Sequence, residues 1–150
     1  MTDSVTIQAL ERVIAVLNED RPTGVPQVTK RRTFPGEEIK AARMAVFLGD
    51  ETIAAPMGSS NQDPLARRVI PIAVQCACAT DDVEAIDALP DPMLNWATAK
   101  LGKTRLEGLV HYVRESATTR RVEHLSLYQV IATCVFEMSY QTRRNDRTRT

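Results

Sequence analysis

Three cysteines and two histidines are the side chains of this sequence most able to bind a metal or attack a substrate. Cys76 and Cys78 are separated by a single residue, which is shorter than the usual spacer of a zinc-binding cysteine pair. No second pair of ligands follows, because His111 and His124 are isolated in the sequence. We therefore predict no metal site. Cys76, Cys78 and Cys134 are interpreted as buried free thiols, typical of a reducing cytosol.

Other catalytic groups lack the neighbours that their chemistry requires. No Gly-x-Ser-x-Gly nucleophile motif occurs, and Cys134 lies within an apolar run, where a thiol is usually inert. Paired carboxylates occur at expected loops or helix starts, where they serve as solvated or capping groups: Glu37-Glu38, Asp50-Glu51 and Asp81-Asp82. Fingerprints of dinucleotide and nucleoside-triphosphate sites are absent. We expect no enzyme activity and no cofactor.

The composition is that of a soluble globular protein with one domain. The 150 residues are 43% hydrophobic and 25% charged, which is ordinary for such a domain. Nineteen basic residues balance nineteen acidic residues, and a zero net charge argues against a dedicated nucleic-acid binder. The first residues predict no signal peptide, and no stretch is long and apolar enough for a predicted membrane span.

The stretch Arg67–Ala79 predicts a central strand. Its side chains alternate, and one face carries only apolar residues: Ile70, Ile72, Val74, Cys76 and Cys78. This face is predicted to lie against a layer of helices. Pro71 has no backbone N–H, so an edge, a bulge or a gap in the strand pairing is expected there.

Two amphipathic helices are predicted to form that layer. The first spans Asp3–Glu19 and is capped by Asp3 or Ser4. The second spans Met93–Leu101; Asp91 is its predicted cap and Gly102 its end. Trp96, the largest apolar side chain, is expected to anchor this helix under the sheet. A short helical turn is predicted between Asp81 and Leu89.

The remaining strands complete a predicted α+β fold. It is an antiparallel or mixed β-sheet with two main helices packed on one face, in a single domain over residues 1–142. The predicted strands are Val28–Phe34, Ala42–Leu48 paired as a hairpin with Thr52–Ala55, Leu106–Ser116 and Leu127–Thr142. Thr118–His124 is predicted to be a loop or a long hairpin arm. We expect a flexible loop at about residues 56–66 and a disordered polar tail at 143–150.

Clusters of basic residues are the candidates for contacts with other proteins. Three adjacent basic residues lie on the predicted strand Val28–Phe34, where they either form a solvated edge or contact a charged partner. We hypothesise that the flexible loop and its flanking arginines face another subunit or partner. A solvated loop beside solvated charges is the alternative. The candidate interface residues are Lys30, Arg31, Arg32, Ser59, Asn61, Arg67, Arg68, Arg120 and Arg121.

The order of these elements resembles the tail terminator family of long-tailed bacteriophages, also called tail completion or minor tail proteins. Three stretches carry the resemblance: Leu65–Val74, Leu106-Glu107-Gly108-Leu109-Val110, and the closing Phe136–Tyr140 followed by a polar tail. Asp81-Asp82 and the helix Met93–Leu101 follow in the expected places. The cysteines and the basic cluster at Lys30–Arg32 are not features expected of this family.

The resemblance implies a structural virion protein without catalytic activity. It would form a ring, expected to be a hexamer, that caps the tail tube, stops tube polymerisation and offers a surface to the capsid neck. Its implied partners are other copies of itself, the tube protein and a neck or connector protein. DNA would only pass through the ring, and no membrane is involved. The chain would be made in the host cytoplasm and located in the virion tail. Two alternatives are a neck or head-completion protein and a small cytosolic α+β enzyme subunit or regulator.

Overall fold

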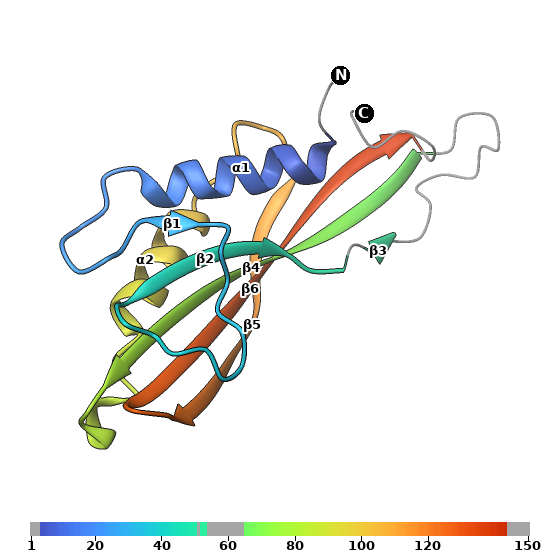
Figure 1. Ribbon diagram of the computed structural model, residues 1–150. Coiled ribbons are helices and arrows are strands. Elements are labelled where there is room, and N and C mark those ends of the chain that lie inside the picture. The colour runs from blue at the N-terminus through green and yellow to red at the C-terminus, as the bar shows by residue number, and fades with distance from the viewer. Residues whose placement is uncertain (1–3, 51, 54–64, 144–150) are drawn as a thin grey trace.

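The computed structural model describes residues 4–50, 52–53 and 65–143, which form a single α+β domain (Figure 1). A mixed sheet has the strand order β1-β2-β4-β6-β5, with the short β3 also paired to β4. Two α-helices pack on one face of it, as predicted. The elements are α1 (Val5–Asn18), β1 (Val28–Thr29), β2 (Arg43–Leu48), β3 (Thr52–Ile53), β4 (Leu65–Thr80), the 3-10 turn η1 (Val83–Ala85), α2 (Asp91–Leu101), β5 (Tyr112–His124) and β6 (Tyr128–Arg143). Within the described ranges, neither helix is long and apolar enough to cross a membrane.

The antiparallel pair β4–β6 forms the centre of the sheet and its longest ladder. The two strands have 16 residues each and pair from Leu65↔Arg143 to Thr80↔Tyr128. The predicted apolar face of β4, from Ile70 to Cys78, is buried throughout against the helices. The alternation of the sequence predicted this face correctly because every second side chain of a strand points to the same side.

Pro71 lies at a gap in the pairing of β4, which confirms one of the three predicted alternatives. The ladder with β2 ends at Leu48↔Ile72, and the ladder with β3 resumes at Thr52↔Val69. Between them, the Pro71 carbonyl accepts a hydrogen bond from Gly49 N at 2.7 Å. An extended residue presents its N–H and C=O to the same side of the strand. The N–H that Pro71 lacks would therefore point into this gap, where no strand residue would accept a hydrogen bond from it. The predicted hairpin is wrong, because β2 and β3 both pair with β4.

The helix α1 begins where its cap was predicted. Ser4 Oγ accepts a hydrogen bond from Ile7 N, and the apolar stripe of the helix is buried: Val5, Ala9, Leu10, Val13 and Leu17. In α2, Asp91 is the first helical residue, and Pro90 occupies the cap position without a side-chain bond. The predicted cap is therefore displaced by one residue.

Trp96 connects the two helices rather than lying under the sheet. Its ring is half-buried against the core, and Nε1 donates a hydrogen bond of 2.8 Å to the Leu17 carbonyl at the end of α1. Met93, Ala97 and Leu101 fill the buried side of α2 instead. The small side chain of Ala97 leaves room for close packing, while the indole N–H satisfies a carbonyl that the helix end leaves without an intrahelical partner.

Two predicted strands differ from the structure. The strand predicted at Val28–Phe34 is limited to Val28–Thr29, and the chain then becomes irregular. The strand predicted at Leu106–Ser116 begins only at Tyr112, because Leu106 and Glu107 have φ of 52° and 59°, in the left-handed region. The segment Thr118–His124, predicted to be a loop or a long hairpin arm, is an arm of the hairpin formed by β5 and β6, which pair up to His124↔Tyr128.

Candidate interface surface

The second face of the sheet, opposite the helices, is partly covered by residues 30–42, called the crossing segment from here on. This irregular stretch leaves β1, passes over β4 and β6, and returns to β2 (Figure 1). Ile39 is buried there against Ala77 and Ile131, which lie on the second face. The segment carries three of the predicted interface residues, so its attachment decides how they are presented.

Two buried glutamines hold the crossing segment in place. The side chain of Gln75 accepts from Thr33 N at 2.6 Å and donates to Thr33 O at 3.0 Å. Gln129 accepts from Ile39 N at 2.6 Å and donates to Glu37 O at 2.9 Å. Each amide therefore acts like the backbone of a neighbouring strand, and it satisfies the backbone N–H or C=O groups of Thr33, Glu37 and Ile39 that face it.

The three basic residues at the start of the crossing segment are exposed, but they do not form one cationic patch. Lys30 forms an ion pair with Glu11 of α1, and Arg31 pairs with Glu37 at 3.2 Å. The guanidinium of Arg32 lies over two aromatic rings, 5.3 Å from the centroid of Phe34 and 4.7 Å from that of Phe47. Phe34 is 56% exposed. Arg32 with Phe34 is the part of this stretch best suited to contact a partner.

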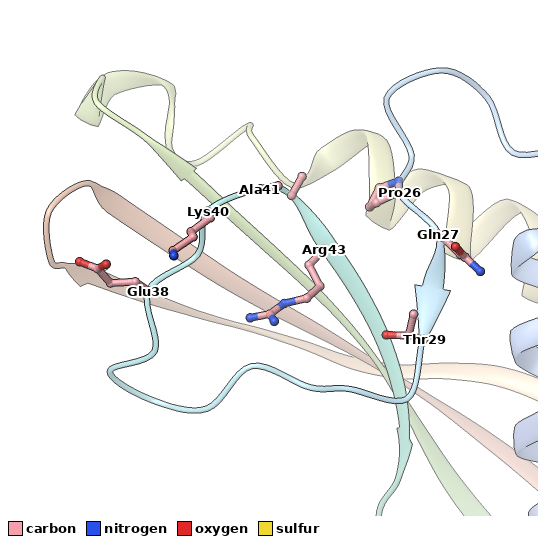
Figure 2. A pocket seen from close by; sticks show the side chains of 8 residues that line it. Pro26, Gln27, Thr29, Glu38, Lys40, Ala41 and Arg43 are labelled. Atoms are coloured by element: carbon pink, nitrogen blue, oxygen red, sulfur yellow. The ribbon is translucent and has the colours of Figure 1, made fainter.

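A hollow of about 390 Å³ opens beside the crossing segment (Figure 2). Its lining comes from the segments next to β1 and from the return of the chain to β2: Pro26, Gln27, Thr29, Glu38, Lys40, Ala41, Ala42 and Arg43. Arg43 is held by an ion pair with Glu37, and its Nε is buried without a hydrogen-bond partner. The lining combines both signs of charge, and none of its side chains is a nucleophile poised beside a base.

Arg67 lies at the other end of the second face, where β4 begins and β6 ends. Its guanidinium is 5.7 Å from the ring centroid of Tyr112, and that of Arg114 is 5.5 Å from the same ring. Arg114 also pairs with Glu137 at 2.8 Å. Tyr112 and Arg114 could not be assigned to this group from the sequence, because they approach Arg67 across β6 only through the registers of β6 with β4 and β5.

The remaining candidates do not join Arg67. Arg68 is only 6% exposed, because adjacent residues of a strand point to opposite faces, so it is not available for a surface contact. Arg120 donates to the Asp87 carbonyl and pairs with Asp91 at 3.4 Å, whereas Arg121 pairs with Glu123 at 2.8 Å. Ser59 and Asn61 lie outside the described residues. So do most of the predicted loop at 56–66 and, apart from the β6 terminus Arg143, the predicted tail at 143–150.

The strand β5 forms one edge of the sheet and is exposed on both faces. Residues 114–120 are exposed without interruption, and the strand pairs with β6 only. A register shift between Glu115 and Ala117 indicates a bulge. At the opposite edge, Asn18 bonds to both backbone groups of Val28, at 2.8 Å and 3.1 Å, and thereby closes β1. The two edges thus differ. In β1 the backbone of Val28 is hydrogen-bonded to Asn18, whereas β5 pairs with a strand on one side only and is called the open strand below.

The thiols lie on the helix-covered face and are poor nucleophiles. All three cysteines are free and buried. Burial raises the pKa of Cys78 and of Cys134 to about 11, and it raises the pKa of Cys76 as well. Among residues 4–50, 52–53 and 65–143, no group of three His, Cys, Asp or Glu side chains is arranged to hold a metal ion.

Comparison with known proteins adds no family. No protein-family model matches this chain, and none of the curated proteins is significantly similar to it. The resemblance to tail terminators therefore stays a prediction.

Proposed function

We propose that this chain is a structural subunit of a bacteriophage tail, a tail terminator that forms a ring on the end of the tail tube. In this role it stops tube polymerisation and presents a surface to the neck of the capsid. It works through contacts between proteins and catalyses no reaction. The finished ring belongs to the virion, after the chain has been made in the host cytoplasm.

The observation that carries the proposal is the open strand β5. A long edge strand exposed on both faces exposes a row of unpaired backbone groups, which isolated proteins usually shorten or cover. Here the edge extends over 13 residues with one bulge, while in β1 at the opposite edge Asn18 bonds both backbone groups of Val28. In an assembly, a neighbouring subunit would cover the open edge at β5, which would explain the difference between the two edges.

The use of the polar side chains also supports a structural role. Gln75, Gln129 and Glu37 are engaged in holding the crossing segment, and the thiols are buried and protonated at neutral pH. In the sequence, α2 lies between the two longest strands, as in the element order on which the resemblance rests, whereas the hairpin of that order is absent because β2 and β3 both pair with β4.

The direct test is to delete this chain from the genome that encodes it and to examine the resulting particles by electron microscopy. We expect tails of uncontrolled length, because nothing then stops the tube. Tails of normal length beside unjoined heads would instead assign the chain to the neck. Normal particles would refute a role in the virion.

A further inference from the structure

The second face of the sheet carries a basic end, defined by Arg67, Tyr112 and Arg114. Arg67 forms no ion pair among the described residues, and Glu137 occupies only one side of the Arg114 guanidinium. This end therefore presents one cation without an ion pair and one that is only partly neutralised, a combination that suits a carboxylate partner.

The same chain offers such carboxylates on the segment 81–87, called the acidic segment from here on. Four acidic residues occur within seven positions, and all four are exposed: Asp81, Asp82, Glu84 and Asp87. None of them forms an ion pair within the part of the chain that the structure describes. Asp82 is engaged locally, because its side chain accepts from Glu84 N at 3.0 Å as the cap of η1.

The two surfaces of one molecule cannot meet. The acidic segment follows the last residue of β4, whereas Arg67 is near its first residue, and the strand runs straight between them (Figure 1). Thirteen steps of a β-strand span about 40 Å. Opposite charges that are fixed this far apart on one rigid ladder can neutralise each other only between different copies of the chain.

We propose that copies of this chain associate head to tail, with the basic end of one copy binding the acidic segment of the next. Contacts of this heterologous kind generate a closed ring when the rotation between copies closes. The inference therefore rests on the proposed function and specifies which surfaces join the subunits of the ring. Complementary charges at such a contact set the register of neighbours and speed their encounter.

The test uses two charge-reversal variants of the full chain. The first carries Arg67→Glu with Arg114→Glu, and the second carries Asp81→Lys with Glu84→Lys. Asp82 is left unchanged because it caps η1. Lys103→Glu with Arg105→Glu is the matched control, since both residues are exposed and lie in the loop after α2, on the helix-covered side of the sheet. The mass of each protein in solution is measured over a range of concentrations, and thermal melts verify that each variant is folded.

We expect each reversed variant alone to associate at least about tenfold more weakly than the unmodified chain, because like charges then face each other. A mixture of the two variants should recover assembly. When the two variants alternate, the reversed basic end of the first meets the reversed acidic segment of the second, and the unmodified basic end of the second meets the unmodified acidic segment of the first. Both kinds of contact join opposite charges. The control variant should assemble like the unmodified chain, and added salt should weaken its association.

Unchanged assembly of both reversed variants would overturn the inference, and so would a mixture that does not recover. An unmodified chain that stays monomeric at high concentration would overturn it as well. These outcomes are separable from the proposed function, which is decided by the length of tails made without the chain. A ring that forms through other surfaces would leave that function intact.

Discussion

At the scale of single residues, the side chains of Gln75 and Gln129 supply hydrogen bonds that the backbone of a neighbouring strand would otherwise supply. The crossing segment has no regular pairing, yet its backbone is buried at Thr33 and Ile39. Gln75 and Gln129 each provide one acceptor and one donor in the spacing of a peptide group. In the sequence, both appear only as polar interruptions on the less apolar faces of β4 and β6.

Replacing Gln75 with Leu should therefore destabilise the fold although the volume changes little. The N–H and C=O of Thr33 would remain buried without partners, at a cost of about 1–3 kcal/mol for each group. Urea denaturation would measure the loss. Gln27→Leu is the control, because Gln27 is exposed, and we expect it to stay within about 0.5 kcal/mol. Similar losses in both variants would contradict the assigned role of Gln75.

The buried thiols make the stability depend on alkaline pH. Burial raises the pKa of Cys78 and of Cys134 to about 11 in the folded chain, whereas a solvated thiol titrates near about 8.5. The stabilisation is therefore fully present below about pH 8.5 and is lost as the pH rises through the folded value, because the unfolded chain releases its protons first. We expect the free energy of unfolding to fall between pH 8.5 and about 11.

Chemical denaturation at several pH values would measure this loss, and Cys78→Ala with Cys134→Ala should reduce its slope. The native protein should also react slowly with a thiol reagent at pH 8 and rapidly once unfolded. Equal rates in the two states would show that the thiols are accessible, contrary to their burial.

At the scale of elements, Trp96 adds a hydrogen bond to the apolar packing of α1 and α2. Trp96 packs against the core with half of its surface and donates to the last turn of α1. Lys100 lies over the same ring at 5.0 Å, which covers its outer face. The tryptophan thus joins the end of α1 to α2 by a polar contact beside the apolar core.

We expect Trp96→Phe to cost about 1 kcal/mol, the usual net value of one hydrogen bond. Trp96→Ala should cost more, yet less than the roughly 3–5 kcal/mol typical of a fully buried aromatic side chain, because the indole is half-buried. Thermal melts of both variants would measure these losses. If Trp96→Phe were as damaging as Trp96→Ala, the Nε1 bond, which both variants lack, would decide the contact rather than the packing of the ring.

At the scale of the whole molecule, the fold is dominated by contacts between distant parts of the sequence. The longest ladder joins β4 to β6, with α2 and β5 between them in the chain. Ile72 and Phe136, which are paired at its centre, lie far apart in the sequence and must meet before this ladder can form. Loop closure of this length is unfavourable until the core has assembled around it.

We therefore expect slow folding, on the scale of milliseconds to seconds that is typical of domains rich in non-local strand pairs. Stopped-flow refolding followed by the fluorescence of Trp96 would measure the rate. Val74→Ala, at the centre of the ladder, should slow folding if the β4–β6 pairing is formed in the transition state. Refolding within tens of microseconds would contradict a transition state that depends on this ladder.

The sequence by itself determined the elements whose side chains follow a clear period. Both helices and the two long strands were predicted from apolar repeats, because the buried face of each element has to match its own geometry. At Pro71 the missing N–H predicted an edge, a bulge or a gap, and the structure has the gap. The α+β class and the placement of both helices on one face were predicted for the same reasons, since one face of the central strand is wholly apolar.

Only the tertiary structure decided which surfaces these elements present. The strand β5 has no apolar period, because both of its faces are exposed, and its conformation depends on the backbone of β6. Arg67 and Arg68 are neighbours in the sequence, but one is at the surface and the other is buried. Tyr112 and Arg114 approach Arg67 only through the registers of β6 with β4 and β5. Register is a long-range property, set by the joint burial of several strands, and no local pattern of residues contains it.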